Sequence, residues 1–315
     1  MTIALLPKHG RQVSCVAFSP NGKWLASASL DGMIRVWDAY KRTVHVDLVG
    51  HEVGMFETNG VTSIAFSPDS KTLVSGGWDD TTRLWEIASG SELFRQCLNP
   101  CDDSAIRSVA YSPDGRTLAA SGHLGTVLLW DSITGQEIRK LDTLAFTGTR
   151  FDVPTVVFSP DGKTLVGSQE DWVLLWDVPS GRQRRKFKVH IDGEDIVSLA
   201  LSPNGSLLAC SSKDATIRIW DLTSSCEWRS LAGEKWPAAS LAFSLQGRIL
   251  ASAWGRDKLI RVWETTSGEE IKSIQIASPT YTVAFSPDGT RLAWGDQEGN
   301  VALRHLSVHI PKRAE

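Results

Sequence analysis

The sequence predicts an all-β protein built from repeated four-stranded units, and three observations support this prediction. A segment ending in Trp-Asp or a close variant recurs along the chain. Within each copy, short stretches rich in Val, Ile and Trp are interrupted roughly every eight positions by Gly, Pro and Asp, which is typical of strands rather than helices. Hydrophobic residues make up 42% of the 315 residues and charged residues 22%, so the chain has enough apolar material for a core and disorder is excluded as its main state.

The repeat has seven copies. The first runs from Val13 to Asp38, and the others begin near Val61, Arg107, Thr155, Val197, Ser240 and Thr282. Six copies close on a tryptophan, 43 to 48 residues after the previous one: Trp37, Trp85, Trp130, Trp176, Trp220 and Trp263. The seventh copy carries Arg304 and His305 at that place. A fixed period of this length predicts one structural unit for each copy.

Each copy has room for four strands. The first strand of the first copy ends at Ser19-Pro20-Asn21-Gly22, which predicts a tight turn because proline fixes φ and glycine accepts a positive φ. The stretches LASAS and IRVWD and the segment 43–48 supply the other three strands. One such sheet cannot bury both of its faces, so we expect seven sheets stacked radially in a ring.

With these motifs the chain resembles the WD-repeat β-propeller family over essentially residues 2–306. The closing Trp-Asp pair is present in Trp37-Asp38 and three later copies, and Trp85-Glu86 is a near match. The resemblance implies a seven-bladed β-propeller with four antiparallel strands per blade. We expect a single domain of this kind over residues 1–315.

The seventh unit lacks a convincing fourth strand of its own. Fourth strands are predicted after the other six units, at residues 43–48, 92–98, 137–141, 184–189, 227–231 and 271–276. The segment from Thr2 to His9 looks like a fourth strand without its first three. We therefore expect the N-terminal strand to complete the seventh blade and close the ring.

The family resemblance also implies a hydrogen-bonded network of His, Asp, Ser or Thr and Trp in each blade. The matching residues are His9, Asp31 and Trp37 in blade one, His51, Asp79 and Trp85 in blade two, Asp214 and Trp220 in blade five, and Asp257 and Trp263 in blade six. Blade six has Glu234 in place of the His. Because the His-Asp pair recurs around the ring, we interpret it as structural rather than catalytic.

The two faces of such a ring differ in sequence. The turns after each first strand stay close to Ser-Pro-x-Gly, whereas the loops between blades vary in length and hold nine acidic against four basic residues. Loops on a rigid scaffold carry recognition. Five acids of these loops are candidate partner-binding residues: Asp102, Asp103, Asp192, Glu194 and Asp195.

Four tryptophans outside the repeat position are expected on the same face: Trp78, Trp172, Trp236 and Trp254. One interpretation is that they pack between blades, where large aromatic rings fill wedge-shaped gaps. The other is an aromatic and acidic surface that binds a partner carrying Lys or Arg. The exposure of the rings distinguishes the two.

Other candidate sites are weaker. A basic run from Arg182 to Lys188 leads along the predicted outer strand of blade four, either as a charged solvated edge or as a contact for nucleic acid or another anion. Cys97 and Cys101 lack a CxxC motif and a nearby His pair, and no P-loop, GxGxxG or GxSxG motif is present. We therefore expect no catalytic residue, metal or cofactor.

The function predicted from the sequence is a non-enzymatic scaffold that binds a protein or peptide through the interblade-loop face. The alternatives are a sensor or assembly subunit that docks through the basic edge of blade four, and an enzyme with a pocket at the mouth of the central channel. The formal charge of −3 disfavours nucleic acid and the absence of a long apolar run disfavours a membrane span. Five scattered cysteines and no secretion signal favour a cytoplasmic location with reduced thiols.

Overall fold

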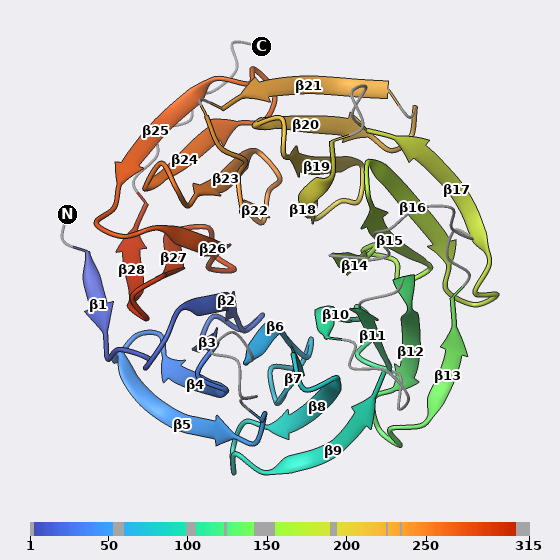
Figure 1. Cartoon of the computed structure of the whole chain (residues 1–315), viewed down its shortest axis with the longest axis vertical. Helices are drawn as coiled ribbons and strands as arrows, with labels where there is room; N and C mark the ends of the chain where they lie inside the picture. The colour runs from blue at the N-terminus through green and yellow to red at the C-terminus, as the bar shows by residue number, and fades with distance from the viewer. Residues whose placement is uncertain are drawn as a thin grey trace.

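The protein forms a ring of seven sheets around a central axis (Figure 1). The computed structural model describes residues 3–52, 60–98, 105–122, 125–141, 155–189, 194–224, 226–233 and 235–306. Each sheet has four antiparallel strands, so the predicted all-β, seven-bladed β-propeller is confirmed.

The first strand of each blade lies nearest the axis (Figure 1). These strands are β2 (Val13–Phe18), β6 (Val61–Phe66), β10 (Ile106–Tyr111), β14 (Val156–Phe158), β18 (Ile196–Leu201), β22 (Ser240–Phe243) and β26 (Thr280–Phe285). The second strands are β3 (Trp24–Ser29), β7 (Thr72–Gly77), β11 (Thr117–Gly122), β15 (Thr164–Gln169), β19 (Leu207–Ser212), β23 (Ile249–Trp254) and β27 (Arg291–Asp296).

The third and fourth strands form the outer half of each blade. The third strands are β4 (Met33–Asp38), β8 (Thr81–Glu86), β12 (Val127–Asp131), β16 (Trp172–Asp177), β20 (Thr216–Asp221), β24 (Leu259–Glu264) and β28 (Val301–His305). The fourth strands are β5 (Thr43–Val49), β9 (Glu92–Cys97), β13 (Glu137–Lys140), β17 (Gln183–Lys188), β21 (Cys226–Ala232), β25 (Glu270–Gln275) and, at the rim of blade seven, β1 (Ala4–Leu6).

The N-terminal strand closes the ring as the sequence predicts. Strand β1 pairs antiparallel with β28, with Ala4 opposite Leu303 and Leu6 opposite Val301. Leu6 is buried in an apolar cluster that also contains Trp37 of blade one. The first residues of the chain therefore contribute both to the seventh sheet and to its packing against the first.

The core is divided among the interfaces between blades. The described residues form seven buried apolar clusters, and each combines residues of two neighbouring blades. Because β3, β7 and the other second strands are buried on both faces, they read as continuous runs of small and apolar residues. Apolar burial between blades is thus the interaction that repeats around the whole ring.

Hydroxyl groups on the first strands add polar links between neighbouring blades. The backbone amide of Val109 donates to Ser63 Oγ over 3.1 Å, and that of Val16 donates to Thr282 Oγ1 over 2.9 Å. The second of these bonds joins residues 266 positions apart. The inner wall therefore continues across the junction of the two chain ends.

The first turns have the conformation that their sequence predicts. Gly22 has a φ of 70° and its amide donates to the Ser19 carbonyl over 2.8 Å. The Ser19 hydroxyl lies 2.7 Å from Asn21 Oδ1 and accepts the Trp24 amide over 2.9 Å. Blade two lacks the glycine, and there Ser70 adopts the left-handed conformation at a φ of 61°.

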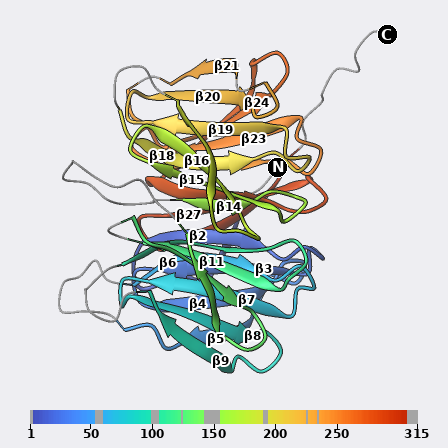
Figure 2. The same cartoon turned by 90° about the vertical axis from the view of Figure 1, so that its right-hand side faces the viewer.

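The strands run between the two faces of the disc, as the side view in Figure 2 shows. The turns between second and third strands bond to the interblade loops, for example through the Trp78 amide and the Gly60 carbonyl at 3.0 Å. These two sets of loops therefore share one face, which we call the interblade face. The Ser-Pro-x-Gly turns form the other, which we call the turn face.

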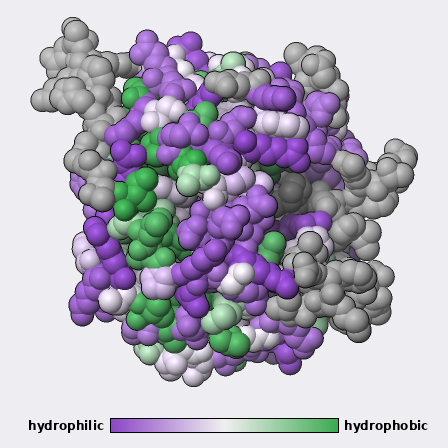
Figure 3. Space-filling view, turned by 60° about the vertical axis from the view of Figure 1, so that its left-hand side comes forward, coloured by the Kyte–Doolittle hydropathy of each residue, from purple (hydrophilic) through white to green (hydrophobic). Residues whose placement is uncertain are grey.

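The rim is mostly hydrophilic on the side that carries β1 and β5 (Figure 3). Figure 3 brings forward the side of the ring that carries β1 and β5, where apolar patches interrupt the polar surface. The exposed apolar side chains of these two strands include Leu5, at 68% exposure, and Val49, at 69%.

Candidate functional site

The polar network is most complete in blade two. Ser75 Oγ lies 2.7 Å from His51 Nε2 and accepts the indole N–H of Trp85 over 2.8 Å. The other ring nitrogen of His51 lies 2.9 Å from Asp79 Oδ1. Arg83, only 3% exposed, donates to the other oxygen of Asp79 over 3.1 Å. Strands β7 and β8 and the loop before β6 are thereby joined by one chain of hydrogen bonds.

These contacts change the acidity of the carboxylates. Burial opposes ionisation of Asp79, but the hydrogen bonds and the charge of His51 outweigh it and hold the pKa of Asp79 well below its ordinary value. In blade one, burial likewise opposes ionisation of Asp31, but the contact with His9 and hydrogen bonds from two backbone amides lower its pKa to about 2. Both groups stabilise the fold in their ionised form.

Blade one has the same network with one longer contact. His9 Nε2 lies 2.7 Å from Ser27 Oγ, which also accepts the indole N–H of Trp37 over 3.0 Å. His9 Nδ1 lies 3.5 Å from Asp31 Oδ2. His9 is 1% exposed, so its contacts bind the interblade loop to the blade and leave little of the ring accessible.

In blade six a tryptophan takes the place of the missing His. The indole N–H of Trp254 donates to Ser252 Oγ over 2.7 Å, and the same oxygen accepts the Trp263 indole over 2.8 Å. Gly233 makes room for the ring, since a Cβ there would lie 2.1 Å from Trp254 Cζ3. Among the described residues Asp257 Oδ2 has no hydrogen-bond partner, and Glu234 lies outside them.

The assignment of Trp254 to a partner-binding surface was therefore wrong. Its side chain is fully buried and completes the interior of blade six. The sequence signal was present, because Glu234 stands where the first two blades have His9 and His51.

Blades four and five have lost the central hydroxyl. In blade five, Cys210 lies two residues after Leu208, which pairs with the motif Trp220. Ser75 lies at the same position in blade two, two residues after the residue that pairs with Trp85. The Trp220 indole N–H consequently lacks a hydrogen-bond partner among the described residues. Asp214 still accepts from Thr216, whose hydroxyl lies 2.7 Å away. In blade four the same position is Gly167, where a Cβ would lie 2.8 Å from Trp176 Cζ3.

The other three face tryptophans are partly exposed and lie in separate sectors of the ring. Trp78 is covered by the Arg107 guanidinium at 4.5 Å from the ring centroid. Trp172 has the Lys186 ammonium at 5.2 Å and packs against the apolar cluster between blades three and four. These two rings are therefore occupied by contacts within the chain, and they do not gather with Trp236 into one surface.

The predicted acidic residues are only partly described. Asp102, Asp103 and Asp192 lie outside the described residues. Glu194 is exposed. Asp195 forms an ion pair with Lys213.

Trp236 lines a pocket on the interblade face. The pocket has a volume of about 500 Å³, which is within the range of small-ligand and peptide side-chain sites. Three blades contribute its lining: Val197, Lys213, Trp236, Pro237, Ala239, Gly255, Arg256 and Tyr281. We call this cavity the Trp236 pocket. Because Val197 and Tyr281 belong to the innermost strands β18 and β26, the pocket lies close to the axis of the ring.

The lining of the Trp236 pocket combines apolar surface with cations. The Arg256 guanidinium lies 4.2 Å from the centroid of the Trp236 ring, and the Lys235 ammonium lies 5.8 Å from it. Gly255 lets the backbone approach Tyr281, since a Cβ at Gly255 would lie 2.8 Å from Tyr281 Cε1. Sequence reasoning missed Arg256 and Tyr281, because nothing in the repeat pattern shows that a turn of blade six meets the first strand of blade seven.

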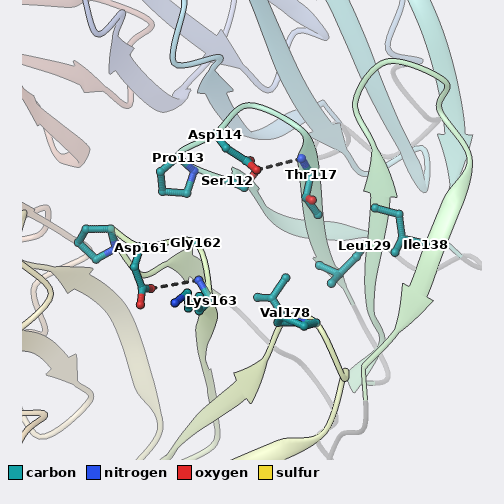
Figure 4. Close-up of a pocket in the computed structure, with 12 residues that line it drawn as sticks. Ser112, Pro113, Asp114, Thr117, Leu129, Ile138, Asp161, Gly162, Lys163 and Val178 are labelled. Carbon is teal, nitrogen blue, oxygen red and sulfur yellow. Dashed lines mark hydrogen bonds between the residues drawn. The ribbon is translucent and has the colours of Figure 1, made fainter.

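A second cavity, shown in Figure 4, lies on the turn face between blades three and four. It has a volume of about 590 Å³ and includes Ile138 and Val178. Its two carboxylates serve their own turns: Asp114 Oδ1 accepts from the Ser112 hydroxyl over 2.6 Å and Asp161 Oδ1 accepts from the Lys163 amide over 3.0 Å. The two carboxylates of this cavity are thus engaged by the fold.

The basic edge of blade four is also engaged. Arg184 pairs with Asp177, and Lys188 Nζ lies 2.9 Å from Asp171 Oδ2. Arg185 donates to the Leu222 carbonyl over 3.0 Å, which ties β17 to blade five. These contacts favour the interpretation of this strand as a charged edge of the fold.

No group of three or more His, Cys, Asp or Glu is placed to hold a metal ion in the described part of the chain. Within the same residues, no helix has the length and apolar character needed to cross a membrane.

Comparison with known proteins agrees with this architecture. The family model "WD domain, G-beta repeat" matches residues 2–38, 42–86, 95–131, 140–177, 181–221 and 228–264. Each match combines all or part of a fourth strand with the first three strands of the next blade, so the sequence repeat is offset from the blade by one strand. The unmatched copy is the seventh, in which Arg304 replaces the motif Trp.

A relative with a similar sequence is the groucho protein of Drosophila melanogaster. It is 27% identical over 156 residues, which cover 49% of this chain and 21% of groucho. The chain therefore matches about a fifth of the length of that relative. Because the family model covers well over half of the chain, the protein belongs to the WD-repeat (WD40) β-propeller family, whose members typically act as scaffolds for protein interactions.

Proposed function

We propose that this protein is a non-enzymatic scaffold that binds a segment of a partner protein on its interblade face, in the Trp236 pocket. The observation that supports the proposal is an apolar cavity of about 500 Å³ formed by three blades close to the ring axis. A partly exposed tryptophan on a rigid wall is a side chain that contributes strongly to binding energy. The seven-sheet ring would hold the wall in place without the partner.

The lining of the pocket supports binding rather than catalysis. Its described residues include no Ser, Cys, His, Asp or Glu, so a nucleophile or general base of those types is not among them. We extend the proposal to a reducing compartment, supported by the four described cysteines, all of which are free thiols: Cys15, Cys97, Cys210 and Cys226.

The expected preference for Lys or Arg on the partner does not enter the proposal. It depended on carboxylates of the interblade loops, and Asp102, Asp103 and Asp192 lie outside the described residues. Asp195 is already paired with Lys213.

The test uses a displayed library of random peptides, from which binders to the wild-type protein are selected and then measured individually. We expect Trp236→Ala to weaken binding by at least about tenfold, because it removes one wall of the pocket. The matched control is Trp228→Ala on the outer strand β21, where the ring is 48% exposed and lies away from the pocket.

Trp228→Ala should leave binding within about twofold of the wild type, as for a residue outside an interface. Urea denaturation midpoints equal to that of wild type would show that both variants are folded. If the selected peptides bind Trp236→Ala as well as wild type, the pocket is not the binding site. If binding is lost only when Arg184 and Arg185 are replaced by acidic residues, the binding site lies at the edge of blade four.

A further inference from the structure

The charges at the Trp236 pocket differ from the acidic character expected of this face. The ionisable side chains in its lining, apart from Tyr281, are Lys213 and Arg256, and Lys235 stands beside the same indole ring. Lys213 is neutralised by Asp195. Among the described residues, Arg256 and Lys235 contact the Trp236 ring and form no ion pair with a carboxylate. Counted over the described residues, the mouth of the pocket therefore has a net positive charge.

The position of the Arg256 guanidinium favours an incoming carboxylate. A guanidinium stacked on an aromatic ring keeps the N–H groups along its edge directed away from the ring, where they can donate in pairs to one carboxylate. The Trp236 ring also limits the freedom of the side chain before any ligand binds. The exposed Arg256 is thus placed to bind an anion at the rim of an apolar cavity.

The floor of the pocket requires a different kind of group. Val197, Pro237 and Ala239, which we call the floor, add apolar surface to the lining alongside Trp236 and Tyr281. Hydrogen-bonding groups are few in this lining, so a buried polar side chain would lose its contacts with water without replacement. An apolar or aromatic side chain fits this floor, and its volume is adequate for one such anchor.

We propose that the Trp236 pocket binds an acidic peptide segment, in which one apolar or aromatic side chain enters the cavity and a neighbouring Asp or Glu is bound by Arg256 and Lys235. This inference rests on the proposed function, because it assigns the chemistry of the partner to the same site. It replaces the Lys- or Arg-bearing partner expected from the sequence with one of opposite charge.

The experiment selects peptides from the displayed random library on the wild-type protein and on Arg256→Glu. Wild type should enrich peptides with an apolar residue next to Asp or Glu, and these should bind Arg256→Glu at least about tenfold more weakly. Arg256→Glu should in turn enrich peptides with Lys or Arg beside the apolar residue. Binding to wild type should also weaken as NaCl rises from low to physiological concentration.

The matched control is Lys258→Glu, the same charge change in the same turn. Lys258 is exposed and does not line the pocket. The Lys258→Glu variant should bind the selected peptides within about twofold of wild type, once the effect of the changed net charge on association is allowed for. Arg256→Lys should fall between wild type and Arg256→Glu, because it keeps the charge but loses the paired donors.

The possible failures are distinguishable. If the selected peptides depend on Trp236 but are neutral or basic, or if Lys258→Glu weakens them as much as Arg256→Glu, the acidic segment is wrong and the proposed binding site remains. If no selected peptide depends on Trp236, both the binding site and the acidic segment are overturned.

Discussion

Blades two and five have the same strands in the same register, but only blade two has a hydroxyl between its motif tryptophan and its second strand. In blade two Ser75 joins His51 and Trp85. In blade five Cys210 occupies that position and the Trp220 indole has no described hydrogen-bond partner. Both blades nevertheless pack against their neighbours through buried apolar clusters. The comparison shows that interblade packing suffices to form a blade, while the polar network adds stability to particular blades.

The largest effect is expected when the network of blade two loses its carboxylate. Asp79→Ala leaves the buried Arg83 with one carboxylate partner, Glu92, in place of two, and removes the carboxylate partner of His51. Glu92 still compensates the charge of Arg83. We therefore expect the free energy of unfolding to fall by about 2 to 3 kcal/mol, the cost of leaving buried donors without their acceptor. Urea denaturation measures it.

The control for this change is Asp257→Ala in blade six. Asp257 Oδ2 has no hydrogen-bond partner among the described residues, so its removal should cost less than about 1 kcal/mol. Equal losses for Asp79→Ala and Asp257→Ala would contradict the view that blade two has the stronger network.

A smaller effect is expected from acid. The pKa of Asp31 is about 2 in the folded protein, against 3.8 as its ordinary value, and that of Asp79 is also depressed. A carboxylate with a depressed pKa contributes stability that is fully present above its ordinary pKa and is lost as pH falls through its folded pKa. The unfolding free energy should therefore decline from about pH 4 towards pH 2.

Thermal unfolding between pH 2 and 6 tests this dependence. Replacing both carboxylates, as Asp31→Asn with Asp79→Asn, should flatten the curve over that interval. A curve of unchanged slope in the double variant would show that other groups cause the acid sensitivity.

The smallest expected effect is a gain. Cys210→Ser places a hydroxyl at the register position that Ser75 holds in blade two, where it can accept the Trp220 indole N–H. A net hydrogen bond of this kind contributes about 0.5 to 1 kcal/mol of stability. Urea denaturation should show this increase. Cys210→Ala is the control, because it changes the volume of the side chain without supplying a hydroxyl, and it should lower the free energy of unfolding by a similar amount.

The repeat pattern was sufficient to predict the fold. Strands, turns and closure by the segment Ala4–Leu6 follow from short-range patterns that recur with a fixed period. The predicted fourth strands agree with β5, β9, β13, β17, β21 and β25 within one residue at each end.

The candidate site was less predictable because its contacts join different blades. The burial of Trp254 depends on its hydrogen bond to Ser252 and on the room that Gly233 leaves for its ring, and the strand pattern shows neither contact. Likewise Trp236 and Arg256 are 20 residues apart in sequence, and stacking between an interblade loop and a turn is not encoded by strand periodicity. Charges counted along the chain give no information on which of them are already paired, as Asp195 and Lys213 are.

The closure of the ring has a mechanical consequence. Ala4, at the start of β1, lies opposite Leu303 near the end of β28, so both ends of the chain leave this strand pair on the same side. A force that pulls the two ends apart would break the backbone hydrogen bonds between β1 and β28 one after another, as in unzipping. It would not distribute the load over all of these bonds at once, as a shear force would. Tension on the termini would therefore open the propeller at blade seven first.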